Sequence, residues 1–440
     1  MSDRFLEFSS RRAFLKSAAV ASGASVLGMA GARAATAPAT GPAGSTPAAP
    51  AATPTLASGG LPQAKVTRIR VYNPPNVNTL FNQSNLVVTV ETDIGITGVG
   101  EGGAKDTIQQ CSERLIGRNP FDIERCWQDM YRAFFYPPGR EKIHAIGALD
   151  MALWDIKGKA FGVPVYDLNG GMARNHCESY YSTGGTGQVL RDNAKAAMDN
   201  GFRAFRIDAA TVPRPGTTFE SHERVRQVIE DCKNVREGVG KNGDWIIDLH
   251  QRFDFADAIR ACKELEDLEP YFVEDPVRTE AFNEDIPKLR QLTTVPIAAG
   301  EEWGQRWDFN KLVESHDLDY VRATMPNVGG ITEMVKVAAM CETHFVGMVP
   351  HFTGPISTAA LVHALGPFSG PVLFEIGGNT RTFAHLPEGL DFKDGKVWPN
   401  KRPGLGVTLD MSKITPVAEF TQAVGGRTTY QRPDGSFTNW

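Results

Sequence analysis

Three acidic residues each follow a short apolar segment. Asp248 follows Trp-Ile-Ile, Glu274 follows Tyr-Phe-Val, and Glu301 follows Pro-Ile-Ala-Ala-Gly. If these segments are neighbouring strands of a parallel barrel, their carboxyl ends meet at one mouth, where barrel active sites are built. Three carboxylates gathered there repel one another unless a cation is bound, and hard oxygen ligands suit Mg²⁺. The spacing therefore predicts a Mg²⁺ site, although any one acid alone is better explained as a helix N-cap or a surface charge.

A histidine lies close to the first of these acids. His250 comes two residues after Asp248, so both side chains point to the same side of a strand. Imidazole has an ordinary pKa of roughly 6.5 and can donate a proton near neutral pH. We therefore expect His250 to serve as a proton donor, the alternative being a histidine that caps the rim of the barrel.

Repeated strand–helix units must position these side chains. Helical patterns separate eight short apolar segments, which start near Cys177, Phe202, Trp245, Tyr271, Val295, Leu318, Val346 and Val372. This alternation predicts an α/β fold with a (β/α)8-type barrel over residues 176–384. A doubly wound open sheet is the alternative, but no GxGxxG motif follows the first strand.

A different pattern precedes the barrel. Period-two alternation at 66–71 and 86–91 predicts antiparallel strands, and helical patterns follow at 108–115, 122–134 and 142–160. We expect residues 63–175 to form an N-terminal α+β capping domain. The Gly- and Pro-rich segment 385–440 is expected to pack back onto it.

The first 62 residues resemble a leader and a tether. Arg11 and Arg12 precede a small-residue apolar stretch, and Ala32-Arg33-Ala34 offers a cleavage site. Residues 1–34 are therefore predicted to be a twin-arginine signal peptide, which implies a periplasmic location. The segment 35–62 is dominated by Ala, Thr, Pro, Gly and Ser, and is predicted to be a flexible linker.

Composition excludes several classes of protein. Lys and Arg number 46 against 51 Asp and Glu, and hydrophobic residues make up 41%, which excludes wholesale disorder. The net charge of −5 and the lack of a basic run after the leader argue against nucleic acid and anionic membranes as partners. Six cysteines contain no CxxC motif, and whether any disulfide forms stays open.

Several motifs together resemble the enolase superfamily, mandelate racemase subgroup. They run in order along the chain after about residue 63: 147–158 (GALDMALWDIKG), 248–250 (DLH), 273–276 (VEDP), 299–301 (AGE), 329–332 (GGIT) and 350–351 (PH). Within this family the chain is most similar to the acid-sugar dehydratases of the galactonate and mannonate types.

The resemblance implies a function and roles for particular residues. It implies Mg²⁺ bound by Asp248, Glu274 and Glu301, abstraction of the proton α to a carboxylate, and an enediolate intermediate. It also implies that His250 is the acid that helps a β-hydroxyl leave, and that His351, at the end of the seventh strand, is the base. The expected partners are a small sugar acid and further copies of the chain in a homo-oligomer.

Two departures from the family pattern leave the base open. Thr324 stands where galactonate-type enzymes have an Asp that supports the histidine base, and the second strand lacks the Lys-x-Lys of racemases. Arg206 matches an arginine that supports a tyrosine base in mannonate-type enzymes, but residues 209–219 contain no tyrosine. His351 is the first candidate for the base, and Tyr180 or Tyr181, assisted by Arg206, is the second.

Four further residues are candidates for binding the substrate. They are Arg252, Glu375, Asn73 and Trp303. The alternative for Arg252 is an ion pair at the rim, for Glu375 a buried ion pair, and for Trp303 packing in the core. Asn73 lies in a polar loop that resembles the family's specificity loop.

The predicted function is Mg²⁺-dependent dehydration of an aldonate-type sugar acid to a 2-keto-3-deoxy acid. An epimerase, racemase or cycloisomerase on the same fold is one alternative. A sugar-acid binding protein that has lost its base is another.

Overall fold

Eight short parallel strands alternate with helices in the computed structural model. The structure describes residues 63–78, 83–133, 139–207, 218–377, 383–423 and 429–438. The predicted signal peptide and linker lie outside the described residues. The strands are β4 (Cys177–Thr183), β5 (Ala204–Ile207), β6 (Asp244–Asp248), β7 (Phe272–Glu274), β8 (Ile297–Ala299), β9 (Tyr320–Val321), β10 (Gly347–Met348) and β11 (Leu373–Gly377). Each begins within about two residues of the segment that the sequence predicts.

The strands pair in chain order, as a barrel requires. The order runs from β4 to β10, and β11 pairs with β4 on the other side. A parallel bridge between Met348 and Val372 joins β10 to the residue that precedes β11. The two edges of the sheet are thus brought together, which agrees with the predicted (β/α)8 architecture and disfavours the open sheet.

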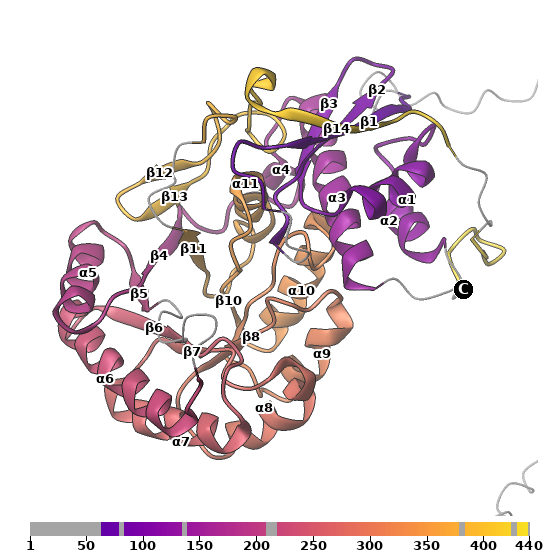
Figure 1. The fold of residues 1–440 in the computed structure, drawn as a ribbon. Helices are drawn as coiled ribbons and strands as arrows, with labels where there is room; N and C mark the ends of the chain where they lie inside the picture. The colour runs from indigo at the N-terminus through magenta and orange to yellow at the C-terminus, as the bar shows by residue number, and fades with distance from the viewer. Residues whose placement is uncertain are drawn as a thin grey trace, which may run out of the picture. The chain divides into compact units, whose positions relative to one another are not determined.

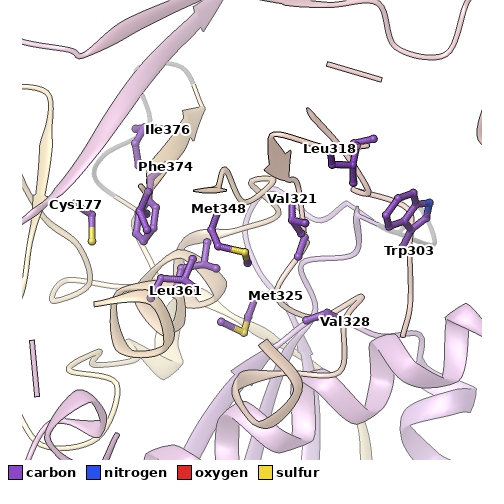
Figure 2. Packing of buried hydrophobic residues seen from close by; sticks show 14 of the residues in the cluster. Cys177, Trp303, Leu318, Val321, Met325, Val328, Met348, Leu361, Phe374 and Ile376 are labelled. Carbon is purple, nitrogen blue, oxygen red and sulfur yellow. The ribbon is translucent and has the colours of Figure 1, made fainter. Parts of the chain in front are cut away.

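Helices cover the outside of these strands (Figure 1). They are α5 (Gly187–Asp199), α6 (Ser221–Val239), α7 (Phe255–Leu265), α8 (Phe282–Arg290), α9 (Arg306–Glu314), α10 (Ile331–Thr343) and α11 (Pro355–Leu365). A large apolar cluster fills the space between strands and helices. Figure 2 shows part of it, where Val321, Met348 and Phe374 come from strands and Leu361 from α11.

The preceding region forms an antiparallel sheet and a helical layer. Strands β1 (Val66–Asn73), β2 (Val87–Thr92) and β3 (Thr97–Glu101) pair in order, and β14 (Thr415–Phe420) pairs with the free edge of β1. Helices α1 (Lys105–Leu115), α2 (Ile123–Arg132), α3 (Arg140–Phe161) and α4 (Val165–Leu168) follow. The hairpin of β12 (Asp391–Lys393) and β13 (Lys396–Trp398) instead pairs with β4.

Buried polar contacts hold this capping region on the barrel. Asp150 of α3 accepts hydrogen bonds from the backbone N–H and hydroxyl of Thr332 at the start of α10. Glu101 of β3 accepts one from the backbone N–H of Ser357 in α11 at 2.8 Å. These hydrogen bonds fix α3 and β3 of the capping region against the barrel.

All six cysteines are buried with free thiols. Two lie in the capping region and four in the barrel, as Cys111, Cys126, Cys177, Cys232, Cys262 and Cys341. Among the described residues, no helix combines the length and the apolar character that a membrane span needs.

Candidate active site

The barrel interior is layered, and the layers explain how the polar side chains are positioned. One apolar layer takes a residue from nearly every strand, namely Tyr180, Ala204, Ile246, Phe272, Ala298, Val349 and Leu373. Because strand side chains alternate, the next inward position lies two residues further on. At six of the strand ends that position is charged or titratable, as Arg206, Asp248, Glu274, Arg322, His351 and Glu375.

Glu301 joins this layer through a turn that only glycine can make. Gly300 follows β8 with a φ of 120°, and a Cβ there would lie 2.7 Å from the ring of Phe309. The three predicted metal-binding carboxylates are all buried, with exposed fractions of 2% for Asp248, 0% for Glu274 and 7% for Glu301. The structure thus brings the three acids to the same end of the barrel.

Arg206 binds several of these carboxylates. Its Nη1 lies 3.0 Å from both oxygens of Glu274 and 3.4 Å from Asp248 Oδ2, and its Nη2 lies 3.0 Å from Glu375 Oε1. The sequence suggested that Arg206 assists a tyrosine base. In the structure its guanidinium is instead engaged by carboxylates, with its carbon 5.8 Å from the ring centroid of Tyr180.

Arg322 is a site residue that the sequence analysis missed. It is fully buried after β9 and forms ion pairs with Glu274 and Glu301, and at 2.6 Å with Glu375 Oε2. Its Nη1 also donates to the hydroxyl of Tyr180 at 2.8 Å. The signal that could have revealed it is an arginine two residues after Tyr320, at the inward position of a strand whose other residues are apolar.

The carboxylates still outnumber the guanidiniums that contact them. Asp248, Glu274, Glu301 and Glu375 share the two cations of Arg206 and Arg322. Buried carboxylates in excess are chemically suited to a divalent cation. In the described part of the chain, no three His, Cys, Asp or Glu side chains are grouped closely enough to hold a metal ion. A metal bound here would therefore displace guanidinium contacts from Glu274.

His250 is held in a charged state by its neighbour. Its Nδ1 lies 2.8 Å from Asp248 Oδ2, and its backbone N–H donates to Asp248 Oδ1 at 2.7 Å. The hydrogen bond to Asp248 raises the pKa of His250 to about 9, against the opposing effect of burial. Because Nδ1 contacts Asp248 and the side chain is 38% exposed, Nε2 is left to face a ligand. A protonated imidazole in this position can donate a proton.

His351 has the opposite character. Burial lowers its pKa below the usual value for histidine, so the ring is neutral at neutral pH. Thr324 Oγ1 donates to the carbonyl of Glu301 at 2.8 Å and lies 3.3 Å from His351 Nδ1. A hydroxyl has one proton to donate, and we assign that proton to the shorter hydrogen bond, the one to the Glu301 carbonyl. The hydroxyl oxygen of Thr324 then accepts the proton of His351 Nδ1–H. His351 Nε2 is then unprotonated and can accept a proton.

Neither tyrosine candidate has the properties of a base. Tyr180 is fully buried in the apolar layer, and burial raises its pKa well above the usual value. Tyr181 points to the other side of β4, where its ring packs 5.4 Å from that of Phe202. The structure therefore favours His351.

Glu375 and Arg252 differ in their surroundings. Glu375 lies in the charged layer, where Arg206 and Arg322 outweigh the effect of burial and lower its pKa, and it accepts a hydrogen bond from the backbone N–H of Phe352. This geometry matches the alternative of a buried ion pair. Arg252 is exposed. It follows His250 and Gln251, which both have left-handed backbone conformations.

Asn73 and Trp303 do not line the charged layer. Asn73 ends β1 and lies opposite Thr415 of β14. Trp303 is 4% exposed, and its ring packs edge-on against Phe282 and Phe309, as the core-packing alternative expects.

Both parts of the chain match known family models. Residues 65–170 match the mandelate racemase / muconate lactonizing enzyme N-terminal domain, and residues 189–413 match the enolase C-terminal domain-like family. Two D-galactonate dehydratases are similar in sequence. That of Xanthomonas campestris pv. campestris (strain B100) is 34% identical, and that of Pectobacterium atrosepticum is 33% identical. Each alignment covers 86% of this chain and 100% of the relative.

Solved structures share the fold. An enolase superfamily member from Salmonella Typhimurium superimposes with a TM-score of 0.73 at 26% identity, over 81% of this chain and 100% of that one. From the domain matches, the sequence relatives and this likeness together, the chain belongs to the enolase superfamily, in its mandelate racemase and muconate lactonizing enzyme branch, and is related to the acid-sugar dehydratases.

Proposed function

We propose that the protein is a hydro-lyase that removes water from a sugar acid and yields a 2-keto-3-deoxy acid. The observation that carries this proposal is a pair of histidines at one barrel mouth, His250 with its Nδ1 bonded to Asp248 and His351 with its Nδ1 beside the hydroxyl of Thr324. Burial lowers the pKa of His351 and favours its neutral, proton-accepting form, whereas the hydrogen bond to Asp248 raises the pKa of His250 to about 9 and favours its proton-donating form. Elimination of water needs one group that accepts a proton and another that donates one.

The chemistry divides between these two residues. His351 Nε2 takes the proton from the carbon next to the carboxylate, and the electron pair of that bond forms the enediolate. His250 gives its Nε2 proton to the hydroxyl on the next carbon, the carbon–oxygen bond breaks, and water leaves. The resulting enol takes up a proton and becomes the 2-keto acid. The second strand lacks the Lys-x-Lys motif that supplies the lysine base of racemases, which favours elimination over racemisation.

Magnesium is part of this proposal. Members of the enolase superfamily generally use Mg²⁺. The buried carboxylates that remain in excess over Arg206 and Arg322 fit it chemically, and Asp248, Glu274 and Glu301 would hold it. A bound Mg²⁺ supplies positive charge beside the substrate carboxylate, where negative charge develops once the α-proton is removed.

The substrate class is proposed from the relatives. The two similar proteins named above are D-galactonate dehydratases, so six-carbon aldonates are the first acids to test.

The test is incubation of the protein with a library of aldonates and uronates in Mg²⁺ buffer, with detection of the 2-keto acid. We expect product from at least one acid, and none with His351→Asn. His316→Asn is the matched control, because His316 is exposed and its left-handed backbone suits asparagine. Binding of acids without product would indicate a binding protein, and exchange at the α-carbon without product would indicate a racemase or epimerase.

We also propose export to the periplasm through the twin-arginine leader. Replacing Arg11 and Arg12 with lysine should retain the protein in the cytoplasm, as measured by cell fractionation. Unchanged periplasmic delivery would contradict this proposal.

A further inference from the structure

Helices α10 and α11 begin with a glycine in the capping position. Each helix follows a strand end that carries part of the proposed base, since Thr324 follows β9 and His351 follows β10. The residues that precede the two helices are Gly330 and Gly354, which have no side chain to accept the first backbone N–H groups. A buried helix end is destabilised when these N–H groups lack acceptors, so another part of the chain must supply them.

Carboxylates of the capping region supply both caps. Asp150 of α3 accepts the backbone N–H of Thr332 at 3.0 Å and its hydroxyl at 2.6 Å, at the second residue of α10. Glu101, at the end of β3, accepts the backbone N–H of Ser357 at 2.8 Å, at the third residue of α11. Both carboxylates have an exposed fraction of 0%, so bulk water does not reach these hydrogen bonds.

The two glycines make room for these carboxylates. A Cβ at Gly330 would overlap Asp150 Oδ2, and a Cβ at Gly354 would overlap Glu101 Oε1. A serine or aspartate, which could cap either helix from its own chain position, would therefore exclude the carboxylate that is present. The same arrangement thus occurs on two neighbouring barrel helices.

A short segment connects the Glu101 cap to the proposed base. Only residues 352–354 separate His351 from α11. The carbonyl of Gly354 accepts the backbone N–H of Thr358 at 3.0 Å and its hydroxyl at 2.8 Å, so the segment ends in the first turn of the helix. A shift of this turn therefore moves His351.

The Asp150 cap is connected to Thr324 in a similar way. The backbone N–H of Val328 donates to the carbonyl of Thr324 at 2.9 Å, and that of Gly330 donates to the carbonyl of Met325 at 3.0 Å. These bonds make the segment between β9 and α10 a compact turn. Because Thr324 Oγ1 lies 3.3 Å from His351 Nδ1, a shift of α10 changes the contact that orients the imidazole.

We infer that Glu101 and Asp150 are positioning residues, which hold the proposed base in place by capping α11 and α10. The capping region thereby contributes to proton abstraction without touching the reacting atoms. This inference rests on the proposed function, because it takes His351 as the base, and it adds to that function two residues from outside the barrel.

The first test compares two substitutions of Glu101. Glu101→Ala removes the cap, whereas Glu101→Gln keeps an oxygen that can accept the N–H of Ser357. With the best acid of the library in Mg²⁺ buffer, Glu101→Ala should lower kcat by roughly 10- to 100-fold, because a displacement of about 1 Å can have the larger effect. KM and Mg²⁺ affinity should stay close to wild type, since the proposed metal ligands follow other strands. Glu101→Gln should restore most of kcat.

Asp155→Ala is the matched control. It removes another buried carboxylate of α3, which accepts the backbone N–H groups of Val99 at 2.9 Å and Leu405 at 2.8 Å and caps neither helix. This variant should lower the thermal midpoint and leave kcat unchanged. A fall in kcat equal to that of Glu101→Ala would overturn the inference, because any loss of stability in the capping region would then slow the reaction.

The tautomer of His351 gives a readout that needs no substrate. The protonated and unprotonated ring nitrogens of a neutral histidine differ in ¹⁵N chemical shift, and His351→Asn identifies the relevant signals among the nine histidines. The wild type and Asp155→Ala should show one form, protonated at Nδ1. Glu101→Ala and Asp150→Ala should show a mixture of tautomers, and Glu101→Gln should show the single form again.

The outcomes separate this inference from the function beneath it. A wild-type tautomer and a wild-type kcat in Glu101→Ala, with only the thermal midpoint lowered, overturn the positioning role even if dehydration is observed. Mixed tautomers in a protein whose wild type forms no 2-keto acid support the positioning role and overturn the proposed dehydration.

Gly354→Ala tests the same contact if Glu101→Ala does not fold. Its new Cβ displaces the carboxylate of Glu101 without removing it, and the extended backbone of Gly354 suits alanine. The same fall in kcat and the same mixture of tautomers are expected. Wild-type values of both would overturn the inference.

Discussion

Thr324 Oγ1 lies 3.3 Å from His351 Nδ1 and donates its own proton to the carbonyl of Glu301. The hydroxyl thereby fixes the tautomer of the imidazole without placing a negative charge beside it. A carboxylate at this position would do both, and would raise the basicity of His351.

Replacing Thr324 should therefore change the pH dependence of activity. Thr324→Asp should raise the pKa of His351, because a carboxylate stabilises the imidazolium, and should move the acid limb of the kcat/KM profile to higher pH. Thr324→Val should lower kcat by about tenfold or more through loss of the oriented tautomer. Thr324→Ser should behave as wild type. An acid limb that stays in place with Thr324→Asp would mean that His351 does not titrate in catalysis.

The two histidine variants should differ in solvent exchange. His250→Asn should prevent loss of water, with a decrease of about 10²–10⁴-fold, yet should still exchange the α-proton with deuterium, because removal of that proton needs only the base. His351→Asn should block both reactions. NMR of the acid recovered from deuterated buffer measures exchange. Exchange at the wild-type rate in His351→Asn would exclude His351 as the base.

Metal removal tests the carboxylate site. EDTA should abolish dehydration and Mg²⁺ should restore it, and Glu274→Gln should weaken Mg²⁺ binding measured by calorimetry. Glu333→Gln is a useful control, because Glu333 is also a buried carboxylate paired with an arginine, Arg306, but lies in α10. Full activity in chelated buffer would contradict the metal proposal.

Arg322 links the metal site to stability. Arg322→Met leaves buried carboxylates with one fewer cation, which should lower the free energy of unfolding by about 3–5 kcal/mol. Mg²⁺ should raise the thermal midpoint of this variant more than that of the wild type, because it can replace the missing charge. The control is Arg290→Met, which breaks an ion pair with Asp319 outside the site. Equal Mg²⁺ shifts in all three proteins would argue against a shared site.

His363 should make the fold sensitive to acid. It is 1% exposed, its Nδ1 accepts the N–H of Tyr166, and burial lowers its pKa to about 4. Between pH 6.5 and 4 an unfolded histidine takes up a proton whereas folded His363 does not, so the unfolded chain binds more protons and stability falls as pH falls. His363→Asn keeps an acceptor and removes the titration. Between pH 6.5 and 4, the His363→Asn variant should lose about 3 kcal/mol less of its free energy of unfolding than the wild type, as measured by urea unfolding. The control His316→Asn should behave as the wild type.

The positions of the three candidate metal-binding carboxylates could be predicted because strand spacing alone determines them. Asp248, Glu274 and Glu301 follow apolar segments one unit apart, and parallel strands carry such residues to one end of the barrel. In the structure the three acids lie at that end of the barrel.

Residues whose roles depend on distant partners could not be predicted. Arg322 acts through carboxylates on β7 and β11 and after β8, and sequence spacing says nothing about those contacts. His385 and Thr353 line one cavity because the segment after β11 returns beside the loop after β10. Trp303 is ambiguous for a different reason, since an aromatic residue near a strand end suits a ligand wall and a core equally well.

The buried cysteines have a consequence for redox chemistry. Burial raises the pKa of five of the thiols, those of Cys111, Cys126, Cys177, Cys262 and Cys341, to about 12, and raises that of Cys232 well above its usual value. Only a thiolate attacks a disulfide or reacts readily with an oxidant. The folded chain therefore resists thiol exchange, and its fold contains no disulfide that reducing surroundings could break.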